Sequence, residues 1–285
     1  MSEKISANAI QAESWAGEMG EKWLAHLDRF EGMIAPVGEA LLAKAAVRPG
    51  DQVIDIGCGG GASSLALAAR VAPDGMVTGL DISPILIAEA QRRARAGGIQ
   101  TAQFVVGDAG RVRIPGDGFD VLFSRFGVMF FEDPYAAFAN MHGFLKPDGR
   151  AVFACWAPPA ENAWVRDLMA IAAEFVELPK PEPRAPGPFA FAEPDYVRDI
   201  LEKAGFNNIR IEPWRGPQMI GGKGATPEEA ADFVMDVLFL GEALEDQPDT
   251  VKAAARARAV ALFQAARTAE GVSLPCMVWF VSADA

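Results

Sequence analysis

The 285-residue sequence contains few cysteines and histidines, the residues that most often bind zinc, and cysteine alone forms disulfide bonds. It has three cysteines, Cys58, Cys155 and Cys276, and two histidines, His26 and His142. These residues are widely scattered and show no spacing typical of a zinc site. We therefore expect no metal ion. An odd number of scattered cysteines also indicates a reducing compartment.

The sequence also lacks a long apolar run and an excess of basic residues. It begins with MSEKISANAI and contains no apolar stretch of membrane-spanning length. We expect a cytoplasmic protein without a membrane span. Lysine and arginine number 26 against 38 acidic residues, for a formal net charge of −12. Because nucleic-acid binding depends on neutralising phosphates, this charge disfavours nucleic acid and favours a small-molecule partner.

Short apolar runs alternate with helical periodicity from residue 52 onward. This alternation is typical of repeated βαβ units in an α/β fold. The predicted strands cover residues 53–56, 76–80, 102–106, 119–124, 149–155, 209–214 and 276–281. The first five are nearly continuously apolar, as expected of a parallel sheet covered by helices on both faces.

Capping residues predict where several helices begin. Ser83 and Asp133 each stand immediately before a proline, which favours a helix start at the following residue. Thr226 and Glu229 fit a capping box at the start of another helix. The prolines of residues 178–188 instead favour an extended surface segment.

A glycine-rich turn follows the first predicted strand in the segment VIDIGCGGG, residues 53–61. Such a turn brings backbone close to a ligand and points helix N-terminal amides at it. The spacing Gly57-x-Gly59-x-x-Ala62 also satisfies the dinucleotide fingerprint, and Asp81 lies at a suitable distance downstream to bind ribose hydroxyls. The turn alone therefore leaves an NAD(P)-dependent oxidoreductase open.

Three carboxylates favour an adenosine that carries a cationic amino-acid tail. Asp55 stands at the carboxyl end of the first strand, where it would attract an ammonium group and repel a pyrophosphate. Asp81 and Asp108 follow the second and third strands, and Asp108 is placed to accept a hydrogen bond from an adenine amino group. The oxidoreductase is further disfavoured because neither Tyr135 nor Tyr196 has a lysine four residues later.

At this point the sequence resembles the class I S-adenosylmethionine-dependent methyltransferases, specifically the bacterial small-molecule group near the ubiquinone and menaquinone C-methyltransferases. The likeness extends from VIDIGCGGG through VTGLDIS (77–83), VVGDA (105–109), FDVLFSRFGVMFFEDP (119–134) and FLKPDGRAVFACW (144–156), with a looser likeness at Trp15 and Trp23. The resemblance implies a doubly wound, seven-stranded, Rossmann-like sheet that is mostly parallel and has an antiparallel last strand. It also implies S-adenosylmethionine as the cofactor.

The resemblance assigns one set of residues to cofactor binding. These are Asp55, Gly57, Cys58, Gly59, Gly61, Asp81, Ile82, Asp108, Ala109, Ser124 and Arg125. Within the set, Asp81 would bind the ribose hydroxyls and Ile82 would pack on adenine. Ser124 and Arg125 would lie near the methionine moiety.

Methyl transfer is an in-line displacement at a sulfonium carbon, which depends mainly on positioning. Positioning contributes roughly 7 to 11 kcal/mol, whereas a general base typically contributes about 100- to 10,000-fold in rate. The residues Ser124-Arg125-Phe126-Gly127 lack the Asn/Asp-Pro-Pro-Tyr/Phe motif of enzymes that methylate amide or nucleobase nitrogen. Oxygen, carbon or an amine is therefore the expected site of methylation.

One histidine and four large apolar residues are candidates for the acceptor side. His26 shares a helical stripe with Trp23 and Phe30, in the region that closes over the cofactor in the resembling family, so it is a candidate catalytic base. His142 is expected to be structural. The expected acceptor pocket is apolar and comprises Trp23, Met129, Phe130 and Trp156. It favours a small hydrophobic or aromatic acceptor.

The expected organisation places one core between helical additions. It comprises an N-terminal helical cap (1–35), a cofactor-binding core (36–156), a lid or linker (157–192), a continuation of the core (193–214), a helical insertion over the acceptor site (215–273) and a last core strand (274–285). Cofactor motifs report binding and say nothing of turnover, so a noncatalytic S-adenosylmethionine-binding regulatory protein is a second hypothesis.

Overall fold

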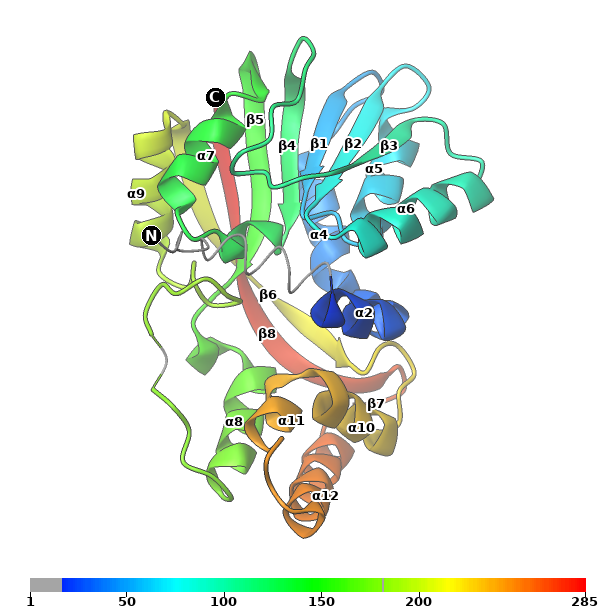
Figure 1. Cartoon of the computed structure of the whole chain (residues 1–285), viewed down its shortest axis with the longest axis vertical. Coiled ribbons are helices and arrows are strands. Elements are labelled where there is room, and N and C mark those ends of the chain that lie inside the picture. Colours follow the sequence, from blue (N-terminus) through cyan, green and yellow to red (C-terminus); the bar gives the residue numbers. More distant parts are fainter. Residues whose placement is uncertain (1–16, 181) are drawn as a thin grey trace, which may run out of the picture.

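A computed structural model describes residues 17–180 and 182–285, which are built around one mixed β-sheet (Figure 1). Its strands are β1 (Gln52–Ile56), β2 (Met76–Asp81), β3 (Ala102–Val106), β4 (Phe119–Arg125), β5 (Leu145–Trp156), β6 (Asn207–Ile220), β7 (Arg267–Thr268) and β8 (Gly271–Asp284). The strand order is β3-β2-β1-β4-β5-β8-β6, and β7 pairs with β8 off this path. The strands β1 to β5 run parallel, whereas β8 runs antiparallel to both β5 and β6. The predicted fold class is confirmed, with β7 as an unpredicted addition.

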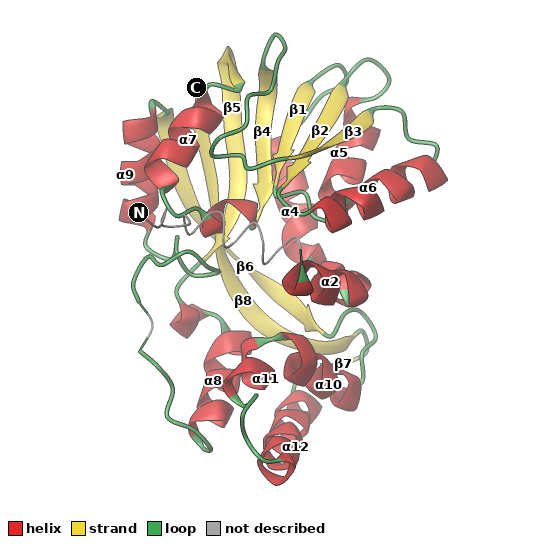
Figure 2. Cartoon of the chain, viewed as in Figure 1, coloured by secondary structure: helices red, strands yellow, loops and turns green. Residues whose placement is uncertain are grey.

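Helices cover both faces of the parallel part of the sheet (Figure 2). They are α4 (Ala35–Ala45), α5 (Ala62–Val71), α6 (Pro84–Ala96), α7 (Pro134–His142) and α9 (Pro194–Ala204). In Figure 1, α7 lies in front of the strands and α5 behind them. No helix in the described ranges is both long and apolar enough to cross a membrane.

The predicted capping residues stand at the N-terminal ends of helices, as expected. The Ser83 hydroxyl accepts a hydrogen bond from the Leu86 amide at the start of α6, and the Asp133 carboxylate caps α7. At the start of α10 (Pro227–Val237), Thr226 and Glu229 form both hydrogen bonds of a capping box. These helix starts follow from local sequence because the capping groups lie within one turn of the amides they satisfy.

The strands β6 and β8 are 14 residues long each and continue past the parallel sheet as a two-stranded ribbon (Figure 1). The predicted strands 209–214 and 276–281 were therefore too short. Both strands contain prolines, at 213 and 217 in β6 and at 275 in β8, and proline cannot donate to a ladder. They are tolerated because β6 is an edge strand, and because β8 has no partner beyond the end of β5 on that side.

Further helices pack around this ribbon and form the lower part of the molecule (Figure 1). They are η2 (Pro159–Glu161), α8 (Ala163–Ala173), α10, α11 (Phe239–Ala243) and α12 (Asp249–Ala265). The segment expected as a lid or linker thus contains the buried helix α8. Within the segment 215–273, helices occupy 227–265, and strand residues flank them on both sides.

Two short helices precede α4 and form the cap. They are α2 (Glu18–Ala25) and α3 (Leu27–Met33), and α3 packs along β6 together with α4. The first sixteen residues of the expected cap, including Trp15, lie outside the described residues.

Candidate active site

The glycine-rich loop after β1 contains three glycines with positive φ, but they differ in what surrounds them. A Cβ on Gly57 would stand 2.6 Å from the Cα of Gly127, and one on Gly61 would stand 2.9 Å from the Cβ of Ala90. These two glycines therefore allow close packing within the protein. A Cβ on Gly59 would meet nothing within 4 Å. Of these three glycines, Gly59 alone presents an open face to a ligand.

The thiol of Cys58 points away from that open face. Its Sγ atom lies 2.9 Å from the position of a Cβ built on Gly79, in the middle of β2, and the residue is buried. Burial raises the pKa of the Cys58 thiol well above its usual value. The side chain is therefore neutral and packs inside the protein. Any contact of Cys58 with the cofactor would be made by its backbone.

Asp81 ends β2 beside the same loop. Its carboxylate accepts hydrogen bonds from the amides of Gly59 (2.8 Å) and Ser83 (2.9 Å), so it fixes both the loop and the start of α6. Burial raises the pKa of Asp81 above its usual value. Each carboxylate oxygen has a second lone pair, so these bonds do not prevent Asp81 from accepting ribose hydroxyls. Ile82 follows it and is half-buried.

Asp55 is fully buried and has one unpartnered oxygen. Its Oδ2 accepts hydrogen bonds from the hydroxyls of Ser63 (2.7 Å) and Ser64 (2.6 Å) on α5, whereas Oδ1 is buried without a partner. Burial raises the pKa of Asp55 to about 6. Buried polar atoms are nearly always paired in native proteins, so Oδ1 is a candidate contact for a cationic ligand group.

Asp108 shapes the turn after β3. Its Oδ1 accepts a hydrogen bond from the Gly110 amide (2.8 Å), and Arg111 lies 3.6 Å from Oδ2. The carbonyl of Ala109 accepts a hydrogen bond from the side chain of Asn140 (2.8 Å). Asp108 therefore has a structural role at this turn, and its contact with adenine stays a prediction.

Ser124 and Arg125 end β4 with their side chains on opposite faces of the sheet. The Ser124 hydroxyl donates to the carbonyl of Ile56 (2.7 Å) and accepts from the amide of Gly127 (3.1 Å). It thus joins the ends of β1 and β4. Because these bonds occupy the hydroxyl, Ser124 acts on the site by positioning backbone.

Arg125 lines a cavity of about 360 Å³ next to the start of α5. Its guanidinium forms no hydrogen bond or ion pair with another described residue, and burial lowers its pKa. Gly38 makes room for it, since a Cβ there would stand 2.7 Å from Arg125 Nη1. The same cavity is lined by the carboxyl-bearing Asp28 and Glu31. It therefore offers both charges that an amino-acid zwitterion needs.

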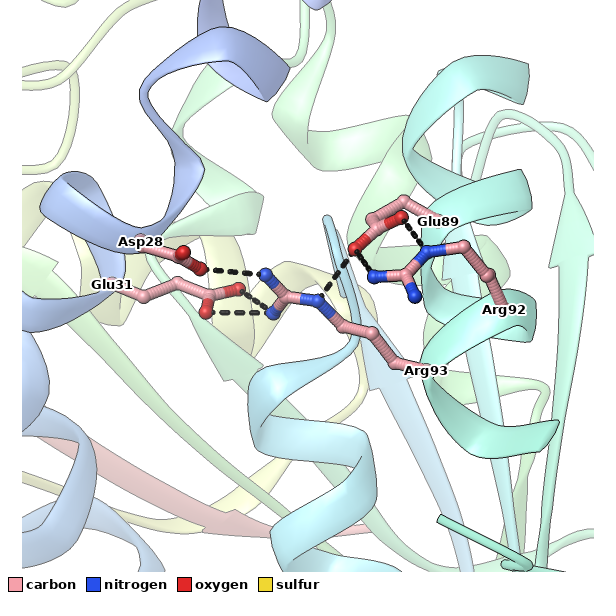
Figure 3. A network of polar contacts seen from close by, with 5 residues as sticks. All are labelled: Asp28, Glu31, Glu89, Arg92 and Arg93. Atoms are coloured by element: carbon pink, nitrogen blue, oxygen red, sulfur yellow. Dashed lines mark hydrogen bonds and ion pairs between the residues drawn. The ribbon is translucent and has the colours of Figure 1, made fainter. Parts of the chain in front are cut away.

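The cap is fastened to the core by a network centred on Arg93 of α6 (Figure 3). Arg93 Nη1 lies 2.9 and 2.8 Å from the two carboxylate oxygens of Glu31, and Nη2 lies 3.0 Å from Asp28. Its Nε bonds Glu89, which also binds Arg92. The sequence predicted none of the contacts between α3 and α6, because they join residues more than sixty positions apart.

Comparison with known proteins agrees with this geometry. Residues 53–149 match the family model described as "Methyltransferase domain". The nocamycin O-methyltransferase of Saccharothrix syringae is 33% identical over 184 residues, which are 61% of this chain and 66% of the relative. The demethylmenaquinone methyltransferase of Geobacillus kaustophilus is 29% identical over 137 residues, which are 46% of this chain and 58% of the relative. The chain covers less than two thirds of either relative.

A solved structure shows the same fold. The putative methyltransferase of Bacillus halodurans C-125 aligns with a TM-score of 0.56 and 16% identity, over 87% of this chain and 97% of that one. Residues 53–149 form a class I S-adenosylmethionine-dependent methyltransferase domain. This finding confirms the family resemblance and decides against the nicotinamide-dependent alternative.

On the acceptor side of the methyltransferase domain, the structure brings together two of the four predicted pocket residues. Met129, in η1 (Gly127–Phe130), accepts a hydrogen bond at Sδ from the Trp156 amide (3.5 Å), and the Trp156 ring stacks on Phe126 with centroids 4.3 Å apart. Trp164 of α8 also contacts Trp156, at 5.2 Å between ring centroids. Trp164 could not be predicted as a neighbour of Trp156, since nothing in the local sequence predicts that α8 returns to the end of β5.

Of the other predicted acceptor-side residues, Phe130 follows Met129 in η1, whereas Trp23 and His26 lie in the cap. Trp23 stacks on Phe30 within the cap, with centroids 3.8 Å apart, and half-buried Phe130 packs on the core. His26 lies at the joint of α2 and α3, edge-on to Phe233 of α10 at 6.2 Å. It lines a second cavity, of about 740 Å³, which includes none of the predicted cofactor residues. Its catalytic role stays a prediction, whereas His142 packs edge-on against Phe206, as expected of a structural histidine.

Proposed function

We propose that the protein transfers the methyl group of S-adenosylmethionine to a small hydrophobic or aromatic molecule, at oxygen, carbon or an amine. The observation that carries this proposal is the pair of unsatisfied charged groups beside the glycine loop. Asp55 has a buried oxygen without a hydrogen bond, and within the described ranges Arg125 forms no hydrogen bond or direct ion pair, although Glu31 and Asp55 attract its charge. Such groups are costly when buried unless a ligand completes them.

The residues around this pair fit the cofactor in their chemistry. Asp55 and the carboxylates of the Arg125 cavity would hold the ammonium group, and Arg125 would hold the carboxylate of the methionine tail. The open face of Gly59 and the remaining lone pairs of Asp81 would receive the ribose. A pyrophosphate would instead meet carboxylates, which agrees with the choice of cofactor.

The protein contributes to the reaction mainly by positioning the reacting groups. When bound, S-adenosylmethionine supplies an electrophilic methyl group on a sulfonium centre. Ser124 fixes the end of β4 against β1, and Gly57 rests on Gly127, so the backbone that borders the reaction centre is rigid before any ligand binds. Positioning of this kind supplies roughly 7 to 11 kcal/mol in displacement reactions, so the lack of a catalytic triad does not argue against methyl transfer.

The acceptor is proposed from the aromatic side chains at the end of β5. Trp156 contacts both Phe126 and Trp164, and the three rings are planar and apolar. Such surfaces suit a ring system and exclude water from it. The relatives named for nocamycin and demethylmenaquinone support an acceptor that is a small organic molecule.

Methyl transfer to a panel of probes tests the proposal. The purified protein is incubated with methyl-labelled S-adenosylmethionine and hydroxynaphthoquinones, phenols, aromatic amines, sugars and nucleotides, with an Asp81→Ala variant as control. The proposal predicts label in one of the aromatic classes, abolished in the variant. Tight cofactor binding without turnover of any class would favour the noncatalytic regulatory protein, and turnover of sugars or nucleotides alone would overturn the acceptor class.

A further inference from the structure

Gln218 of β6 is buried without any partner for its side-chain amide. It is 0% exposed, and both Nε2 and Oε1 lack a hydrogen bond. Among the described residues it is the one side chain that has a donor and an acceptor atom both buried and unpaired. Leaving a buried polar group unpaired costs about 1 to 3 kcal/mol, so this amide lowers the stability of the protein as it stands.

The strand register places Gln218 beyond the carboxyl end of the parallel sheet. Trp156, the last residue of β5, pairs with Val278 of β8, which pairs with Trp214 of β6. Gln218 lies four residues beyond Trp214 and on the same face, because side chains alternate along a strand. It therefore lies about 13 Å past the level of Trp156, on the side of the sheet where open α/β folds bind their ligands.

The cover over this end of β6 comes from the cap and from α10. A Cβ on Gly32 of α3 would stand 3.2 Å from the Cα of Gly222, which follows β6 directly. Phe30 of α3 meets Phe233 of α10 edge-on, with centroids 5.1 Å apart. The cap and the helical insertion thus meet near the end of β6, and the Arg93 network holds the cap on the core.

A second unpaired donor lies near the end of β5. The indole Nε1 of Trp164 is buried without a partner, although its ring packs between Trp156 and Phe239 of α11. Tryptophan N–H groups normally find an acceptor when buried. Two polar side chains beyond the carboxyl end of the parallel sheet thus lack partners, and one of them, Trp164, lies against aromatic rings.

We propose that Gln218 recognises the methyl acceptor, an inference that rests on the proposed methyltransferase function. Its amide N–H donates to a carbonyl oxygen of the acceptor, and its Oε1 accepts from a neighbouring hydroxyl. The acceptor class is thereby narrowed to a planar, mainly apolar molecule with a hydroxyl next to a ring carbonyl. Trp164 supplies a further N–H to an acceptor oxygen.

A Gln218→Met variant tests the inference, because methionine has a similar length and no strong hydrogen-bonding group. Calorimetry on the full-length protein saturated with S-adenosylhomocysteine compares two probes whose hydroxyls stay protonated at neutral pH, 1-hydroxyanthraquinone and 2-naphthol, which lacks the carbonyl. Wild-type protein is expected to prefer the quinone. In the variant, affinity for the quinone should fall about tenfold or more, which corresponds to one or two lost hydrogen bonds, whereas affinity for 2-naphthol is unchanged.

Thermal unfolding of the free variant gives an independent readout. If the Gln218 amide is unpaired, its removal should leave the unfolding temperature unchanged or raise it. If the amide makes a structural hydrogen bond, its removal should lower the unfolding temperature. Gln103→Met is the matched control, since the Gln103 amide is already bonded to Thr78 (3.0 Å). This control should lose some stability and keep the wild-type preference for the quinone. Trp164→Phe, which retains a ring but loses the N–H, should weaken binding of the quinone as well.

Retention of the wild-type preference by Gln218→Met overturns the inference, whatever its stability. Wild-type protein that binds 2-naphthol as tightly as the quinone, or that binds neither probe, overturns it too. Failure of the wild-type protein to bind S-adenosylhomocysteine at all would instead show that the proposed function itself is wrong.

Discussion

Gly57 lies against Gly127, with so little space that a Cβ on Gly57 would stand 2.6 Å from the Cα of its neighbour. The contact joins the loop after β1 to the turn after β4. The Ser124 hydroxyl bridges the same two segments, through Ile56 and the Gly127 amide. The shape of the cofactor loop is therefore built into the protein before any ligand binds.

Two glycine substitutions should separate folding from cofactor binding. Gly57→Ala forces a side chain into backbone at a φ of 66°, so we expect a loss of several kcal/mol in unfolding free energy. Gly59→Ala meets no atom within 4 Å and has a φ of 55°, so its cost should be only about 1 kcal/mol. It should nevertheless weaken S-adenosylmethionine binding strongly, because its methyl group enters the open face of the loop.

Chemical denaturation and calorimetric titration of both variants measure the two effects. Equal loss of stability in the two variants would contradict the distinct roles assigned to the two glycines.

Replacing Asp55 with Asn should stabilise the free protein and weaken its binding of the cofactor. The pKa of Asp55 is raised by burial from 3.8 to about 6, so the folded state keeps a proton that the unfolded chain releases. Wild-type stability therefore falls as the pH rises between these two values, by roughly 3 kcal/mol in total. At pH 8 the Asp55→Asn protein should be the more stable one, and the difference should shrink at pH 5.

Unfolding measured across this pH range checks the sign of the effect. Wild-type affinity for S-adenosylmethionine should also decrease as the pH falls below about 6, because a protonated Asp55 no longer attracts the ammonium group. An affinity for S-adenosylmethionine that stays constant from pH 8 to pH 5 would argue against this role.

Arg125 should recognise the carboxylate of the methionine tail. A hydrogen-bonded charge contact of this kind is worth about 1.5 to 3 kcal/mol, so Arg125→Met should lose about 10- to 100-fold in affinity for S-adenosylmethionine. The suitable comparison ligand is decarboxylated S-adenosylmethionine. The wild-type protein should bind it more weakly than S-adenosylmethionine, whereas the variant should bind the two ligands with similar affinity. If the variant lowers affinity for both ligands equally, Arg125 acts through structure and not through the carboxylate.

The Arg93 network should hold the cap on the core (Figure 3). Arg93→Gln removes the contacts to Glu31 and Asp28, so we expect faster proteolysis or hydrogen exchange in α3 and a modest loss of cofactor affinity, of about threefold to tenfold. Arg92→Gln is the control, since Arg92 is bonded within α6 to Glu89. Equal exchange in the two variants would show that packing alone holds the cap.

The sequence predicted the elements that depend on neighbouring residues. The capping groups of Ser83, Asp133 and Thr226 act within one helical turn, and the short apolar strands have patterns that do not depend on distant contacts. For the same reason the glycine loop and Asp81 could be placed at the carboxyl ends of adjacent strands.

The sequence could not predict features that depend on distant contacts. The bond between Arg93 and Glu31 spans 62 positions. The long ribbon of β6 and β8 contains prolines that are acceptable only at an unpaired edge, which becomes known once the strand order is known. Likewise, Gln218 fell in the expected helical insertion of residues 215–273, and its burial without partners depends on how distant segments pack around β6.

Calorimetric titration of the purified protein with S-adenosylmethionine, S-adenosylhomocysteine and NAD shows which cofactor the protein binds, with Asp81→Ala as the matched variant. We expect binding of both adenosyl ligands at one site per chain, no binding of NAD, and loss of the adenosyl ligands in a variant that remains folded. Binding of NAD with neither adenosyl ligand would contradict this expectation.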